Sequence, residues 1–207
     1  MFNIYEELND THIDVLREIG NIGAGNAATA LADILDDRVE ISIPIVRVTD
    51  FDTAVNALGG AESMTVGVML NYYGDANGMI MFLINMDDAK LVMKILLQGY
   101  GEEDENEITE MKLSAIKEIG NILGSSYIGS IATLTGLQIE LSIPYVAIDM
   151  AGALMSVPII EFGAVGDKVM FIEESFSGRE HNLKSNVVMF AQVDTLRIIM
   201  ERLGIGI

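Results

Sequence analysis

The stretch EIGNIGAGNAATA, residues 18–30, contains the G-x-G-x-x-A spacing of a dinucleotide-binding turn in Gly23, Gly25 and Ala28. Such a turn follows a strand and opens a helix, so that the phosphates meet free backbone N–H groups. Here the glycines fall within an amphipathic helical pattern that begins near Asp10. The pattern therefore favours small residues that let helices pack closely, and it disfavours nucleotide binding.

A second copy of the stretch supports this interpretation. The segment EIGNILGSSYIGS occupies residues 118–130, and a shift of 100 residues aligns residues 18–22 with 118–122 without a gap. The second copy has Leu123 and Ser125 in place of the two glycines, so the dinucleotide spacing is lost while the Glu, Gly and Asn are kept.

The same shift also aligns a later segment in each half. EISIPIVRV at residues 40–48 matches ELSIPYVAI at residues 140–148, and the identities are grouped in these two blocks. Grouped identities at one constant offset are the signature of an internal repeat. We therefore predict a tandem duplication, with repeats of about residues 9–100 and 108–207.

Each repeat is predicted to contain a helix, then several strands, then a closing helix. In the first repeat, Asn9, Asp10 or Thr11 can cap a helix that continues to about Leu35. After it we expect strands over residues 40–48, 64–72 and 78–84, and a closing helix over residues 87–98. In the second repeat we expect a helix over about residues 109–135, strands over 140–148, 153–162, 167–175 and 186–192, and a helix over 194–203. The acidic residues 102–107 are expected to connect the repeats as a solvated loop.

Neither repeat has an evident core of its own. We therefore expect residues 1–207 to form a single α+β domain with internal pseudo-two-fold symmetry. Its strands should be shared in one mainly antiparallel sheet packed against helices, with the first helix of each repeat exposed on one side.

Composition excludes several classes of protein. The chain has 31 Asp and Glu against 12 Lys and Arg, a formal charge of -19, which disfavours nucleic acid and anionic membranes as partners. No apolar run approaches the roughly 20 residues of a membrane span, and the acidic start shows no secretory signal. Cysteine is absent, so disulfides and thiolate nucleophiles are excluded. A cytoplasmic protein without membrane insertion is expected.

A narrow polar stripe follows each repeated helix. Because a helix turns about 100° per residue, positions 14, 18, 21 and 25 lie on one side of it. The first copy has Asp14, Glu18, Asn21 and Gly25 there, and the second has Ser114, Glu118, Asn121 and Ser125. In either copy alone, Glu and Asn could be merely solvated helix residues. Their repetition at the same offset, while many neighbours change, favours a surface that contacts another protein.

Both copies resemble the signature of the CheC, CheX and FliY phosphatases of bacterial and archaeal chemotaxis. The matching patterns are Asp14-x3-Glu18-x2-Asn21-x22-Pro44 and Ser114-x3-Glu118-x2-Asn121-x22-Pro144. The first position admits Asp or Ser in this family, so neither copy lacks a motif residue. Two motifs without further domains resemble the CheC type, and the resemblance covers the whole chain in its order of elements.

This resemblance implies a function. The substrate would be the phosphorylated response regulator CheY, which carries its phosphoryl group on an aspartate. Asn21 and Asn121 would position the attacking water, and Glu18 and Glu118 would contact the regulator. The protein would have no cofactor of its own and would rely on Mg²⁺ bound by the regulator. The receptor deamidase CheD is a second partner implied by the resemblance.

The sequence contains no metal-binding or nucleophile motif of its own, which agrees with such a borrowed mechanism. His12 and His181 stand alone and are expected to be surface or capping residues. Asp14 and Ser114 would support the motifs, and Pro44 and Pro144 are expected to shape the strands without chemical roles. An alternative remains open, in which the stripes dock CheY or CheD as a non-catalytic adaptor.

Overall fold

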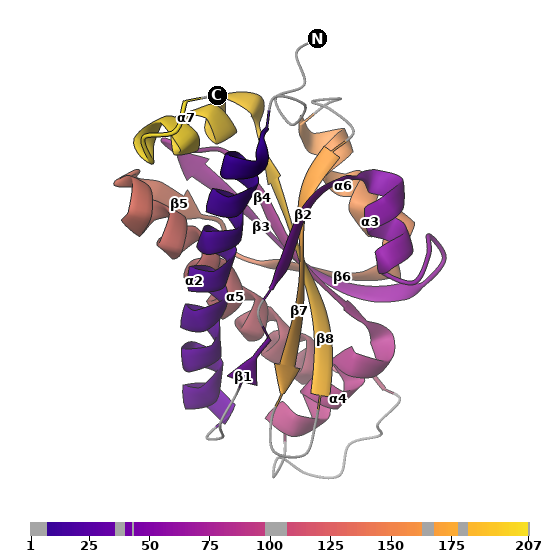
Figure 1. The fold of residues 1–207 in the computed structure, drawn as a ribbon. Helices are drawn as coiled ribbons and strands as arrows, with labels where there is room; N and C mark the ends of the chain where they lie inside the picture. Colours follow the sequence, from indigo (N-terminus) through magenta and orange to yellow (C-terminus); the bar gives the residue numbers. More distant parts are fainter. Residues whose placement is uncertain are drawn as a thin grey trace.

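The computed structural model describes residues 8–35, 40–42, 44–97, 107–162, 168–177 and 182–206 (Figure 1). The elements of the first half are α2 (Asp10–Leu35), β1 (Glu40–Ile41), β2 (Ile45–Asp50), α3 (Phe51–Ala57), β3 (Met64–Gly74), β4 (Gly78–Asn85) and α4 (Met86–Leu96). Those of the second half are α5 (Glu110–Thr135), β5 (Ile139–Leu141), β6 (Tyr145–Met150), α6 (Ala151–Phe162), β7 (Lys168–Ser177), β8 (Asn182–Ala191) and α7 (Val193–Arg202).

The strands form one eight-stranded sheet that both halves share. Its order is β1-β7-β8-β4-β3-β5, with β2 also paired to β7 and β6 also paired to β3. Every pairing described is antiparallel. The shared antiparallel sheet and the α+β class are thus as predicted.

The strand order reads the same from either edge when β2, β3 and β4 are matched with β6, β7 and β8. The edge strand of each half therefore pairs with a strand of the other half. This order is what pseudo-two-fold symmetry requires, whereas a common origin of the two halves stays a prediction.

Both faces of the sheet are covered. On one face, residues such as Val68, Leu70 and Ile80 pack in a core with α2, α4, α5 and α7. On the other face, Met81, Leu83 and Phe171 pack with α3 and α6. Since successive residues of β3 and β4 are buried on alternate sides, these strands are almost continuously apolar.

One strand prediction was wrong. Residues 153–162 lie within α6 and do not form a strand, and the short helix α3 at the matching place of the first half was not anticipated. The segment ALMSVPIIEF is apolar on nearly all sides, and a short apolar run can form a buried strand or a buried helix. The sequence of α6 therefore has no polar face that would reveal helical periodicity, and it contains Pro158, which is unusual inside a helix.

The other predicted elements are present, with shifted ends or with an interruption. The segments 40–48 and 140–148 are each divided into two short strands, because the ladder stops before Pro44 and Pro144. The closing helix of the first half spans Met86–Leu96, close to the predicted 87–98. Residues 98–106, which hold most of the predicted acidic connector, and His181 lie outside the described residues.

Candidate functional site

The two motif helices α2 and α5 pack against each other through small residues. A Cβ atom added at Gly23 would lie 2.7 Å from Cδ1 of Tyr127, so only glycine fits there without a shift. Nearby, Nδ2 of Asn26 donates a hydrogen bond to Oγ of Ser130 at 3.1 Å. Gly23 and Gly25 lie in the middle of α2 and not in a strand-to-helix turn, so a Rossmann phosphate site is excluded here.

A glycine inside each motif brings the helix close to the sheet. A Cβ at Gly20 would lie 2.9 Å from Cγ2 of Val46 on β2, and one at Gly120 would overlap Val68 on β3. At about 100° per residue, Glu18 then lies on the far side of α2 from the sheet, and Asn21 lies on its flank. The close approach at the glycine therefore fixes the direction of the two neighbouring polar side chains.

The predicted stripes lie at the protein surface. Asp14, Glu18, Ser114 and Glu118 are exposed, whereas Asn21 and Asn121 are partly buried. Within the described residues, neither glutamate bonds to the asparagine of its own motif. Each stripe thus presents an exposed carboxylate one turn from a partly buried carboxamide.

The two asparagines differ in their surroundings. Oδ1 of Asn21 is buried and accepts no hydrogen bond in the described part of the chain, and Asn121 has no such buried, unpaired atom. An unpaired buried oxygen costs about 1–3 kcal/mol. The Asn21 oxygen therefore lacks a hydrogen-bond donor within the described residues.

The motif prolines lie beneath the helices and outside the stripes. Pro44 is buried between β1 and β2, and Pro144 is partly buried between β5 and β6. These strand pairs form the two edges of the sheet, where α2 contacts β2 and α5 contacts β6. Proline lacks an N–H group and so ends the ladder at both places, which agrees with a structural role.

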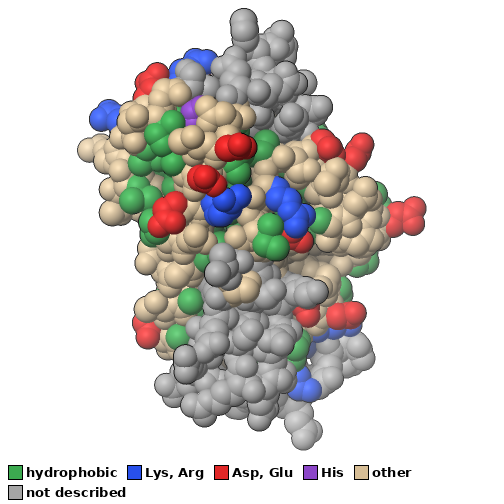
Figure 2. Space-filling model, viewed as in Figure 1, with side chains coloured by type: hydrophobic (Ala, Val, Ile, Leu, Met, Phe, Trp, Pro, Cys, Tyr) green, Lys and Arg blue, Asp and Glu red, His purple; other side chains and the backbone are tan. Residues whose placement is uncertain are grey.

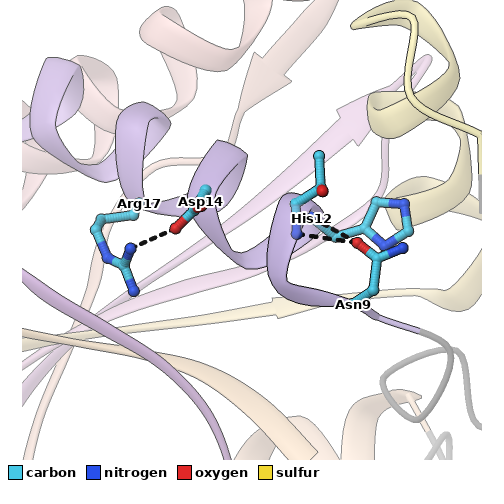
Figure 3. A network of polar contacts seen from close by, with 5 residues as sticks. Asn9, His12, Asp14 and Arg17 are labelled. Carbon is cyan, nitrogen blue, oxygen red and sulfur yellow. Dashed lines mark hydrogen bonds and ion pairs between the residues drawn. The ribbon is translucent and has the colours of Figure 1, made fainter.

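A cation accompanies each stripe, and the sequence interpretation did not single it out. Arg17 forms an ion pair with Asp14 three residues earlier on α2 (Figure 3). The second copy has Lys117 at the equivalent position, where residue 114 is a serine and cannot form that pair. The signal that could have revealed it is a basic residue at the same offset in both copies of a strongly acidic chain. On the face shown in Figure 2, basic and acidic side chains lie side by side.

The start of α2 is fixed by a capping arrangement (Figure 3). Oδ1 of Asn9 accepts hydrogen bonds from the backbone N–H groups of Thr11 and His12. Nδ1 of the buried His12 accepts in turn from the backbone N–H of Asn9 at 3.0 Å. His12 takes the place of the usual Glu in a capping box. Its other ring nitrogen, Nε2, then carries the proton and donates to the carbonyl oxygen of Gly206 at 3.1 Å.

Neither a metal centre nor a membrane-spanning segment is evident in the parts of the chain that the structure describes. Over those residues there is no group of three or more His, Asp or Glu side chains that could hold a metal ion. None of the described helices is long and apolar enough to cross a bilayer.

Comparison with known proteins places this fold and its motifs. A model of the CheC-like family matches the chain twice, at residues 12–47 and 111–148. The CheY-P phosphatase CheC of Bacillus subtilis (strain 168) is 32% identical over 206 residues, which is 98% of this chain and 98% of that protein. The flagellar motor switch phosphatase FliY of the same bacterium is 28% identical over 141 residues, covering 68% of this chain and 36% of FliY.

A solved structure agrees with these sequence matches. Thermotoga maritima FliY superposes with a TM-score of 0.70 at 27% identity, over 95% of this chain and 98% of the other. The architecture, an antiparallel sheet with the two motif helices on one face, is therefore shared with the flagellar protein FliY. The chain itself belongs to the CheC-like family.

Proposed function

We propose that this protein is a phosphatase that removes the phosphoryl group from phosphorylated CheY. The observation that carries the proposal is the pair of surface stripes, each with an exposed Glu one turn from a partly buried Asn, on the two motif helices of a CheC-like fold. Relatives named as phosphatases cover the same region of the chain, which supports the assignment.

The phosphatase itself needs to supply few catalytic groups for this reaction. Water attacks the phosphorus, the bond between phosphorus and the aspartyl oxygen breaks, and the aspartate leaves as a carboxylate. The regulator's own Mg²⁺ and lysine stabilise the charge that develops on the phosphoryl oxygens, so what remains is to hold the water in line. We assign this role to the carboxamides of Asn21 and Asn121, which can accept a hydrogen bond from water and orient it.

The glutamates have a separate task. Glu18 and Glu118 are exposed and lie one turn before the asparagines, on the side of each helix that is turned away from the sheet. A carboxylate in that place can pair with the regulator's active-site lysine and set the depth to which the helix enters. Asp14 and Ser114 lie a further turn back and support this contact at its rim.

The test is turnover. Purified protein at a small fraction of the concentration of phosphorylated CheY should accelerate phosphate release over many catalytic cycles, with Mg²⁺ supplied for the regulator. A non-catalytic adaptor would bind the regulator in proportion to its own amount and leave the rate of phosphate loss unchanged. Binding without acceleration would therefore replace the phosphatase assignment with the adaptor assignment.

CheD is proposed as a second partner, at a surface that α6 forms with the segment between β5 and β6. Ile143, Tyr145 and Ile160 are 83%, 67% and 79% exposed. Ile143 and Tyr145 line a pocket of about 240 Å³ together with Val157 and Glu161 of α6. Since α6 covers the opposite face of the sheet from α2 and α5, this surface can bind CheD while a stripe holds CheY. Loss of CheD binding in Ile160→Asp, with CheY turnover retained, would support this placement.

A further inference from the structure

Lys117 is the basic residue of the second stripe, and its position is repeated in the first stripe by Arg17. Only 12 of 207 residues are Lys or Arg, so a cation at the same offset in both motifs is not a by-product of composition. An exposed lysine on a helix is ordinarily just solvated. The repetition, and the serine at position 114 in place of a carboxylate, give this lysine a more specific role.

The helix geometry places Lys117 one turn before Asn121, on the same side of α5. Lys117 and Asn121 are four residues apart, so they lie within about 40° of each other around α5 and one turn apart along it. Ser114 lies three residues before Lys117 on the same flank. Lys117 is exposed, and its side chain is long and flexible enough to extend to the space in front of Asn121, where the substrate's phosphoryl group must lie if Asn121 positions the water.

The two stripes differ in whether this cation is already neutralised. Asp14 pairs with Arg17 in the first stripe. In the second stripe, Ser114 has no charge to offer, and Lys117 is exposed and has no ion pair within the described residues. The second stripe consequently presents a free ammonium group, whereas the first presents a pair with no net charge.

Resting on the proposed function, we infer that Lys117 is a specificity-determining residue of the second site and that its ammonium contacts the phosphoryl oxygens of the phosphorylated regulator. A phosphoryl group is dianionic at neutral pH, and the chain carries a charge of -19, so docking is opposed by like charge. A local cation offsets that repulsion at the second site. At the first site Asp14 pairs with Arg17 and neutralises its charge, so the two sites differ in affinity for the phosphorylated form.

The experiment isolates one site at a time and measures initial rates of phosphate release over a range of phosphorylated CheY. In an Asn21→Ala background, Lys117→Gln should raise KM about two- to fivefold with kcat nearly unchanged, which is the range of an exposed ion pair. Lys117→Arg should restore KM. Ser114→Asp, which supplies the missing carboxylate of the first stripe, should raise KM in the same direction as Lys117→Gln.

Two controls separate a phosphoryl contact from a general effect of charge. The difference between Lys117 and Lys117→Gln should fade between about 50 mM and about 500 mM salt, because exposed charges are screened. The substitution should weaken binding of CheY activated with beryllofluoride, a phosphoryl mimic, and leave binding of unactivated CheY unchanged. In the Asn121→Ala background, Asp14→Ser frees Arg17 and should lower KM.

The inference is overturned by an unchanged KM in Lys117→Gln at low salt, or by an equal effect on activated and unactivated CheY. An Asn21→Ala protein without any turnover, beside an active wild type, would also overturn it, because the second site would then contribute nothing. Failure of the proposed function is a distinct result, since in that case the wild-type protein itself does not accelerate phosphate release.

Discussion

Asn26 on α2 donates a hydrogen bond to Oγ of Ser130 on α5, and that hydroxyl donates in turn to the carbonyl oxygen of Ser126. The hydrogen bond between Asn26 and Ser130 joins the two motif helices next to the close contact between Gly23 and Tyr127. A double-mutant cycle of Asn26→Ala and Ser130→Ala should give a coupling free energy of about 0.5–1.5 kcal/mol in chemical denaturation. Strictly additive effects would mean that the bond contributes nothing to holding the helices together.

Gly120 should be the motif residue most sensitive to added volume. A Cβ there overlaps Val68, so Gly120→Ala forces α5 away from the sheet and should lower the free energy of unfolding by about 1–3 kcal/mol. Gly129→Ala on the same helix is the matched control. A Cβ at Gly129 meets nothing within 4 Å, so this change should stabilise the protein by about 0.5–1 kcal/mol. Equal denaturation midpoints for the two variants would contradict the close approach.

The motif helices were predictable because two independent signals agree on them. Polar residues recur with helical spacing, and the same residues recur in the other half at one offset, so the start of α2 at Asp10 and the end of α5 at Thr135 follow from the sequence. The sequence also predicted that the two halves share one sheet, because neither half has an evident core of its own. The exchange of edge strands between halves, by contrast, depends on pairing over long distances that no local pattern encodes.

Features that depend on packing were not predictable. The helix α6 was missed because its residues are apolar all round, and a helix is recognised by its periodicity. The buried oxygen of Asn21 depends on how α2 lies over the edge of the sheet, and the matching residue Asn121 has no such oxygen. A duplicated motif thus predicts two equivalent sites, whereas the asymmetric packing of the two helices makes their surroundings different.

His12 should contribute to stability through the start of α2. His12→Ala removes an acceptor for the N–H of Asn9 and a donor to Gly206, and should cost about 1 kcal/mol, or about 2–4 °C in Tm. His12→Gln can still accept from Asn9 as in an ordinary capping box and should recover part of the loss. Thermal unfolding followed by circular dichroism measures both variants. A Tm of His12→Ala equal to wild type would show that the cap is not needed.

Replacement of the two asparagines tests the catalytic assignment and its asymmetry together. Asn21→Ala and Asn121→Ala should each reduce turnover of phosphorylated CheY, and the double variant should lose nearly all of it. Asn121→Ala should have the larger effect, because Oδ1 of Asn21 is buried and must become accessible before it can orient water. Asn21→Ala should not lower the free energy of unfolding, since it removes a buried oxygen that lacks a donor. Substantial turnover in a folded double variant would contradict the water-positioning role of the asparagines. A larger loss of turnover from Asn21→Ala than from Asn121→Ala would show that the first site is the more active one.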